Sequence, residues 1–173
     1  INELGLQPVV FGMPDEWDLK LRIQDICPRV HLADGKTIRH TAALMARCAA
    51  FVSNDSALAH VASAMDVPVV MLCGPTDPGE VRPYGPSGRV LFAGIGCSPC
   101  FRVGRKQMSC TNSVHQACMK SIGVQQVLNE VRELLSKTIS RVPSGIRSSE
   151  SRVGSINEAK IVRSLPVLTG AYQ

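Results

Sequence analysis

Aromatic residues are scarce in this chain, at 4% of its 173 residues. Proteins that bind single-stranded nucleic acid stack the bases on aromatic side chains, so this scarcity argues against that class of function. The net charge of +5 does not argue for it either, because residues 137–173 carry +4 of it and the first 136 residues only +1. We therefore expect no nucleic-acid partner, and we predict that 137–173 form a basic, disordered tail, since this stretch is rich in Ser, Arg, Gly and Pro.

Long hydrophobic runs and an export signal are also missing. The longest apolar run, Val67–Cys73, has the length of a strand, whereas spanning a bilayer takes about 18 residues. The first residues do not resemble a signal peptide. Seven cysteines without an export signal favour a reducing compartment over a disulfide framework. Because the chain starts at Ile1, we expect it to be a piece of a longer protein.

The stretch from Phe51 to Pro78 has the pattern of one βαβ unit. A short apolar strand ends at Ser53, a helix of small residues follows from about Ala57 to Met65, and a buried strand runs over Val67–Leu72. Parallel sheets bind their ligands beyond the carboxyl ends of the strands. The two polar loops at those ends, 54–56 and 74–78, are therefore the candidate site.

The rest of the chain repeats the alternation of strands and helices. We predict further strands at 8–11, 30–32 and 90–92, and helices at 13–26, 38–48 and 124–135, with Thr37 as the cap of the second helix. This order predicts an α/β fold, a Rossmann-like parallel sheet flanked by helices, over a domain of residues 1–136.

The turn Asn54-Asp55-Ser56 has two possible roles. The free backbone N–H groups at the start of a helix can bind an anion such as a diphosphate. Alternatively, Asp55 or Ser56 caps its own helix, which explains the residue types equally well. If a ligand binds, the Asp55 carboxylate suits sugar hydroxyls, and Ser56 with the nearby amides suits phosphate.

His60 and the loop 74–78 are two further parts of the candidate site. His60 follows Ser56 by one helical turn, so it can reach a phosphate or a sugar, or it can be an ordinary residue at the edge of the core. The loop 74–78 is explained by turn chemistry alone, although Thr76 and Asp77 could point at a ligand over the sheet edge.

Four cysteines, Cys97, Cys100, Cys110 and Cys118, have a spacing that resembles a set of metal ligands. Four thiolates can hold a structural zinc ion, but only one close Cys-x-x-Cys pair is present, and free or redox-active thiols are the other possibility. A basic patch in the same loop could meet phosphates of a saccharide or be a solvated loop: Arg102, Arg105 and Lys106.

Several motifs together resemble the carboxyl half of glycosyltransferase family 9, the ADP-heptose:lipopolysaccharide heptosyltransferases. They are Asp55-Ser56-Ala57-Leu58-Ala59-His60, Pro68-Val69-Val70, Gly74-Pro75-Thr76-Asp77-Pro78 and Pro83-Tyr84-Gly85. The resemblance covers about residues 4–135. It implies the second domain of a two-domain GT-B enzyme, which binds an ADP-sugar donor and uses a lipopolysaccharide core saccharide as acceptor. It implies no cofactor or metal, and a cytoplasmic location with peripheral association with the inner membrane.

The resemblance also assigns roles to residues. It implies that Asp55 lies near the sugar hydroxyls, His60 near the donor, and Ser56 and Ala57 at the diphosphate. Thr76 and Asp77 would complete the donor site. An acid, Glu16 or Asp15, would hold the ribose. The segment Gly35 to Thr37 would lie beside the adenine.

Two departures from the family pattern stand out. Ala57 occupies a position where the family usually has Gly, so a Cβ crowds the approach of a phosphate. The family's first domain, which supplies the acceptor contacts and the acidic general base, has no counterpart here, so we predict no catalytic residue in this chain. The transfer implied is inverting: an acceptor hydroxyl attacks the anomeric carbon while ADP leaves.

Two other classes compete with this interpretation. A non-catalytic, zinc-stabilised interaction module would account for the cysteines. A nucleotide-binding domain of an oxidoreductase would share the fold, but it requires G-x-G-x-x-G after the first strand, and Gly12 is followed by Met13 and Pro14.

Overall fold

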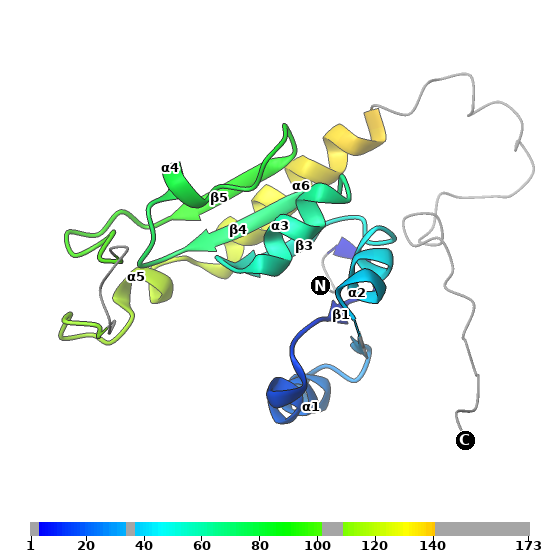
Figure 1. The fold of residues 1–173 in the computed structure, drawn as a ribbon, viewed down its shortest axis with the longest axis horizontal. Coiled ribbons are helices and arrows are strands. Elements are labelled where there is room, and N and C mark those ends of the chain that lie inside the picture. The colour runs from blue at the N-terminus through cyan, green and yellow to red at the C-terminus, as the bar shows by residue number, and fades with distance from the viewer. Residues whose placement is uncertain (1–3, 34–36, 102–108, 141–173) are drawn as a thin grey trace, which may run out of the picture. The chain divides into compact units, whose positions relative to one another are not determined.

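The computed structural model of the protein describes residues 4–33, 37–101 and 109–140. They belong to two compact units, one ending at Ala49 and the other starting at Ala50. Each unit contains a parallel sheet with helices, as the alternation of elements predicts (Figure 1). The division of the strands between two sheets is a feature that the alternation does not reveal.

The first unit is built on two short strands, β1 (Val9–Val10) and β2 (His31–Leu32), which pair in parallel. Between them lie a 3-10 turn (Pro14–Glu16) and helix α1 (Trp17–Ile26), and helix α2 (Ile38–Met45) follows β2. The predicted helices over 13–26 and 38–48 are confirmed, the second ending three residues early.

The buried residue of α1 is not one of its apolar residues. Lys20 is the buried one, and its ammonium group donates a hydrogen bond of 3.1 Å to the Ala33 carbonyl while lying 5.1 Å from the centre of the Trp17 ring. Leu19, Leu21 and Ile26 are exposed. Their mixed spacing in the sequence already lacked the regular stripe of a helix that covers a core.

The second unit is a three-stranded parallel sheet in the order β3 (Phe51–Asn54), β4 (Val69–Cys73), β5 (Gly88–Phe92). Helix α3 (Ala57–Ala64) connects β3 to β4, so the predicted βαβ unit is confirmed. The consecutive residues Val69, Val70 and Met71 of β4 are all buried. Since neighbouring residues of a strand point to opposite faces, both faces of β4 are covered.

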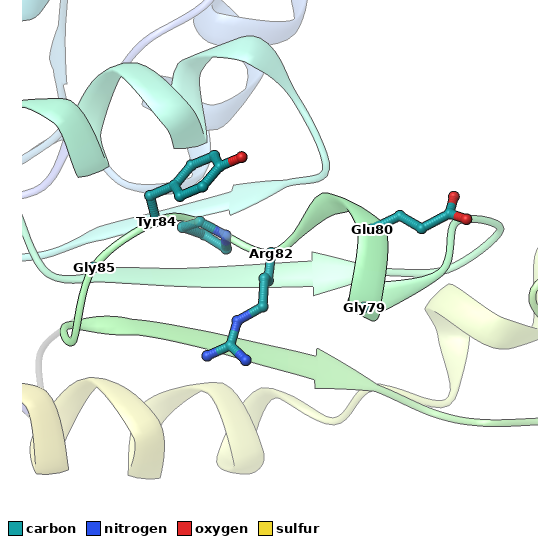
Figure 2. Close-up of a pocket in the computed structure, with 6 residues that line it drawn as sticks. Gly79, Glu80, Arg82, Tyr84 and Gly85 are labelled. Carbon is teal, nitrogen blue, oxygen red and sulfur yellow. The ribbon is translucent and has the colours of Figure 1, made fainter.

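Between β4 and β5 the chain forms a short helix that the sequence pattern did not predict, α4 (Pro78–Val81) (Figure 2). The pattern assigned this stretch to a loop, because Asp before Pro is common in turns. In the structure Asp77 is instead the N-cap of α4, with its Oδ1 accepting a hydrogen bond of 2.8 Å from the Gly79 N–H. Asp followed by Pro is also a good helix start, since proline is favoured in the first turn.

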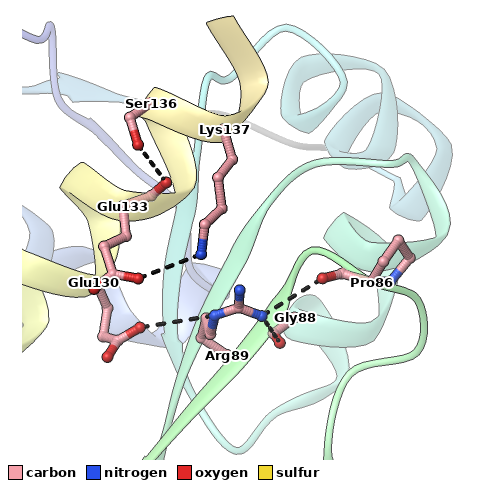
Figure 3. Close-up of polar contacts among 7 residues, drawn as sticks. All are labelled: Pro86, Gly88, Arg89, Glu130, Glu133, Ser136 and Lys137. Atoms are coloured by element: carbon pink, nitrogen blue, oxygen red, sulfur yellow. Dashed lines mark hydrogen bonds and ion pairs between the residues drawn. The ribbon is translucent and has the colours of Figure 1, made fainter. Parts of the chain in front are cut away.

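Helix α6 (Val124–Ser140) packs on β4 and β5, and Figure 1 shows it on the face of the sheet opposite α3. Its anchors are the buried Val131 and Leu134. An ion pair of 3.9 Å also joins Arg89 of β5 to Glu130 (Figure 3). Such a partly exposed pair contributes about 0–1 kcal/mol, whereas each buried aliphatic side chain contributes about 1.5–3 kcal/mol, so the apolar contact holds the helix.

The predicted basic tail overlaps this helix. Lys137, the first residue of that stretch, lies within α6 and forms an ion pair of 3.4 Å with Glu133, one turn earlier (Figure 3). The prediction for residues 141–173 falls outside the described residues.

A second short helix, α5 (Ala117–Lys120), packs close to the end of β4. A Cβ at Gly74 would lie 2.6 Å from the Met119 sulfur and 3.1 Å from that of Cys118. Gly74 is therefore needed for this close approach, and any side chain at position 74 would push α5 away from the loop.

Candidate functional site

Two predicted loops meet at the carboxyl edge of the three-stranded sheet. β3 and β4 pair in parallel with Asn54 opposite Leu72, and the Asp55 N–H extends this ladder with a bond of 3.2 Å to the Leu72 carbonyl. The turn that starts α3 therefore lies beside the loop that leaves β4 at Gly74. Six residues of the second unit were predicted to form a site: Asp55, Ser56, Ala57, His60, Thr76 and Asp77. The structure brings the two loops that carry them side by side, and their grouping goes no further than that.

The side chains of the turn do not cap α3. Ser56 occupies the N-cap position, yet its hydroxyl lies 2.9 Å from the Ser53 hydroxyl and makes no capping hydrogen bond. The Asp55 carboxylate makes no hydrogen bond or ion pair with any described residue. The alternative that Asp55 or Ser56 caps this helix is therefore wrong, and the first N–H groups of α3 have no partner from the turn's side chains.

The Thr76 hydroxyl is a second polar group at this edge that lacks a strong partner within the described residues. Its oxygen is fully buried and makes no hydrogen bond of normal geometry with the described part of the chain. Leaving such a group unpaired costs about 1–3 kcal/mol, and a bound ligand is one way to satisfy it.

Cys73, the last residue of β4, connects these groups. Burial raises the pKa of its thiol, the nearby Thr76 hydroxyl lowers this pKa, and the negative charge of Asp55 raises it again. The protein group beside the Thr76 hydroxyl is thus the Cys73 thiol, which is only a weak hydrogen-bond partner. Asp55, Cys73 and Thr76 form one neighbourhood.

The other predicted residues of these loops are His60, Ala57 and Asp77. His60 is half-buried and lies one turn along α3 from Ser56, whereas Ala57 is exposed at the start of the helix. Asp77 uses one oxygen to cap α4, and its other oxygen has no hydrogen-bond partner among the residues that the structure describes. No signal in the sequence distinguishes this structural task from a direct contact with a ligand.

Glu16 and Thr37 lie in the first unit, where both stabilise helix starts. The Glu16 carboxylate accepts a hydrogen bond of 2.7 Å from the Met13 N–H. The Thr37 hydroxyl accepts one of 3.2 Å from the His40 N–H, as its predicted capping role requires. Gly35 and Lys36, expected beside the adenine, fall outside the described residues.

The cysteine cluster lies next to the Gly74-Pro75 loop. The Ser98 hydroxyl donates to the Gly74 carbonyl, and the N–H groups of Cys100 and Phe101 donate to the Pro75 carbonyl at 2.9 and 2.7 Å. Within residues 4–33, 37–101 and 109–140, no three His, Cys, Asp or Glu side chains are arranged to hold a metal ion. The zinc-stabilised module therefore has no support from the geometry. The predicted basic patch of Arg102, Arg105 and Lys106 falls outside the described residues.

A pocket of about 300 Å³ lies on the second unit between α4 and the turn that precedes β5. Sequence patterns did not identify it as a cavity, although Tyr84 and Gly85 belong to one of the family motifs. Figure 2 shows that the Glu80, Arg82 and Tyr84 side chains point in different directions. The pocket does not gather polar groups around one point, so it does not define a binding site.

Comparison with known proteins decides the family. The profile of glycosyltransferase family 9 (heptosyltransferase) matches residues 2–110. The chain belongs to glycosyltransferase family 9. The resemblance noted in the sequence is thereby confirmed.

The relatives of this family-9 chain are curated heptosyltransferases and solved glycosyltransferases. It is 34% identical over 145 residues to lipopolysaccharide heptosyltransferase 2 of Salmonella typhimurium, covering 79% of this chain and 39% of the relative. It also resembles the structure of E. coli ADP-heptose lipopolysaccharide heptosyltransferase II, with a TM-score of 0.62 and 26% identity over 80% of this chain and 39% of that one. A glycosyltransferase of family 9 from Veillonella parvula gives a TM-score of 0.57, again at 26% identity, over 78% of this chain and 38% of that one.

These matches confirm the predicted fold class, a parallel sheet flanked by helices as in the GT-B glycosyltransferases. The family-9 chain spans about 39% of the length of the relatives in Salmonella typhimurium and E. coli. In the described ranges, none of its helices combines the length and the apolar character that crossing a membrane requires.

Proposed function

We propose that this chain is the donor-binding part of an inverting glycosyltransferase, which transfers a heptose-like sugar from an ADP-sugar to a lipopolysaccharide core saccharide. The family supports the reaction class, since the relatives are lipopolysaccharide heptosyltransferases. One observation of this chain carries the proposal. The Asp55 carboxylate and the start of α3, which have no side-chain partner within the described residues, lie at one edge of a parallel sheet together with the buried Thr76 hydroxyl, whose neighbour is the weak Cys73 thiol.

Each of these groups matches one part of an ADP-sugar. The Asp55 carboxylate accepts hydrogen bonds from sugar hydroxyls, and it would repel a phosphate placed beside it. The Ser56 hydroxyl and the amides from Ala57 onward face the diphosphate, where the positive end of the helix dipole favours negative charge. His60 and Thr76 supply further donors, and the free oxygen of Asp77 accepts from the sugar.

Glu16 and Thr37, which belong to the first unit, are predicted from the resemblance alone to contact the nucleoside. Glu16 uses one carboxylate oxygen on Met13, which leaves the other for a ribose hydroxyl. The Thr37 hydroxyl accepts from His40, so its own proton is available to the adenine.

The proposed chemical step uses the backbone amides at the start of α3 to stabilise the leaving group. An acceptor hydroxyl attacks the anomeric carbon from the face opposite the leaving group, and a base outside this chain takes its proton. Negative charge grows on the departing diphosphate, next to the amides at the start of α3, which stabilise it without having to reorient. Peripheral association with the cytoplasmic face of the inner membrane would bring the acceptor to the site.

A thermal-shift titration of the full-length protein tests the proposal. ADP-heptose should raise the melting temperature more than NAD at the same concentration, because only the ADP-sugar offers a hexose-like ring to Asp55 beside its diphosphate. Equal shifts for the two ligands, or no shift with ADP-heptose, would disprove the donor site.

Replacing Thr76 with valine separates ligand binding from folding. Valine keeps the shape but removes the unpaired hydroxyl, so the free energy of unfolding without ligand should rise by about 1 kcal/mol. The affinity for ADP-heptose should fall about tenfold, since one hydrogen bond to the ligand is lost. Chemical denaturation and calorimetric titration measure the two effects. A loss of stability in the absence of ligand would show that a strong protein partner holds the Thr76 hydroxyl instead.

A further inference from the structure

Asn112 ties two of the cysteines of the second unit to each other. Its side-chain amide donates a hydrogen bond of 3.3 Å to the Cys97 sulfur. Its backbone lies near enough to the Cys110 sulfur to lower the pKa of that thiol. Asn112 therefore neighbours both cysteines, so Cys97 and Cys110 belong to the same part of the second unit.

Cys110 is the accessible member of this pair. It is exposed, whereas Cys97 is half-buried. The backbone N–H of Gln116 donates a hydrogen bond of 3.3 Å to the Cys110 sulfur. Gln116 holds this position with a φ of 58°, in the left-handed region that residues with a side chain rarely adopt.

These contacts favour the ionised form of the Cys110 thiol. The N–H groups of Gln116 and Asn112 lower its pKa, and the positive charge of Lys120 adds to the effect. The thiolate is the nucleophilic form of cysteine, so an exposed sulfur that accepts a hydrogen bond from the Gln116 N–H is set up to react with electrophiles.

We propose that Cys110 is a site of reversible thiol modification and that Cys97 is its resolving thiol. In the first step the Cys110 thiolate attacks one sulfur of a low-molecular-weight disulfide. A mixed disulfide forms, and one small thiol leaves with the proton that Cys110 gave up. In the second step the Cys97 sulfur attacks Cys110, which closes a Cys97–Cys110 disulfide and releases the second small thiol. Two protein thiols are oxidised and one small disulfide is reduced to two thiols.

Cys100 provides a matched control within the same loop. It is exposed like Cys110, but no hydrogen bond to its sulfur exists within the described residues. A difference in reactivity between these two cysteines therefore reports the contacts from Asn112 and Gln116 and not exposure alone.

Alkylation of the full-length protein with limiting iodoacetamide at pH 7, followed by peptide mass spectrometry, tests the first part. Cys110 should be labelled at least about threefold faster than Cys100, because a larger fraction of it is thiolate. Equal rates, or faster labelling of Cys100, would overturn the proposal.

Incubation with glutathione disulfide tests the second part. The unaltered protein should yield a Cys97–Cys110 disulfide, and Cys100→Ser should yield the same product. In Cys97→Ser the reaction should stop at the mixed disulfide on Cys110, whereas Cys110→Ser should take up no glutathione at positions 97 or 110. A mixed disulfide that persists on Cys110 in the unaltered protein, or a disulfide that joins Cys100 instead, would contradict the role of Cys97.

Discussion

Asp55→Ala should abolish the thermal stabilisation that ADP-heptose gives to the full-length protein. In the proposed complex the carboxylate accepts hydrogen bonds from two sugar hydroxyls, each worth about 1.5–3 kcal/mol because the acceptor is charged. Losing about 3 kcal/mol weakens binding more than a hundredfold. A ligand concentration that saturates the unaltered protein then leaves the variant almost empty, and its melting temperature no longer rises.

The same substitution should leave the free protein intact. Asp55 makes no hydrogen bond or ion pair within the described residues, and its side chain does not cap α3. Asp25→Ala, which removes an exposed carboxylate from α1 in the first unit, is the matched control and should keep the full shift. If Asp55→Ala retained the shift, or if Asp25→Ala also lost it, Asp55 would not be a donor ligand.

Met71→Ala should cause the largest loss of stability among single substitutions in the second unit. Met71 lies in the central strand β4 and is completely buried. Truncating a buried methionine costs about 2–5 kcal/mol, because apolar surface is lost and a cavity remains. The unfolding midpoint in urea should fall accordingly, with an unchanged slope of the free energy against urea concentration.

Met65→Ala is the control for this experiment. Met65 follows the last turn of α3 and is 40% exposed, so the same chemical change should alter the free energy of unfolding by no more than about 0.5 kcal/mol. Equal effects at the two positions would mean that β4 is not the centre of the packed core.

The order of strands and longer helices could be predicted from the sequence because each long element carries its own periodicity. The βαβ unit from Phe51 to Cys73 and helix α6 are examples. Helices α4 and α5 could not, because four residues make little more than one turn and show no repeat. The Asp77-Pro78 pair was the available signal for α4, and the sequence pattern assigned it to a turn.

The site was predictable only as a pair of loops. Which polar groups lack partners depends on contacts that no local pattern contains. Ser56 has the residue type of a helix cap, yet its hydroxyl is directed at Ser53. Thr76 looks like a turn residue, yet it is buried beside Cys73. Asn112 carried no predicted role, and its hydrogen bond to the Cys97 sulfur appears only in the folded chain.

The position of α6 after the sheet has a consequence during translation. The ribosome completes β3, β4 and β5 by Phe92, but the helix that covers one face of β4 starts only at Val124. Because domains fold as the chain emerges, the nascent sheet presents an apolar face until α6 leaves the exit tunnel. The second unit therefore completes its fold only after about fifty further residues have been synthesised.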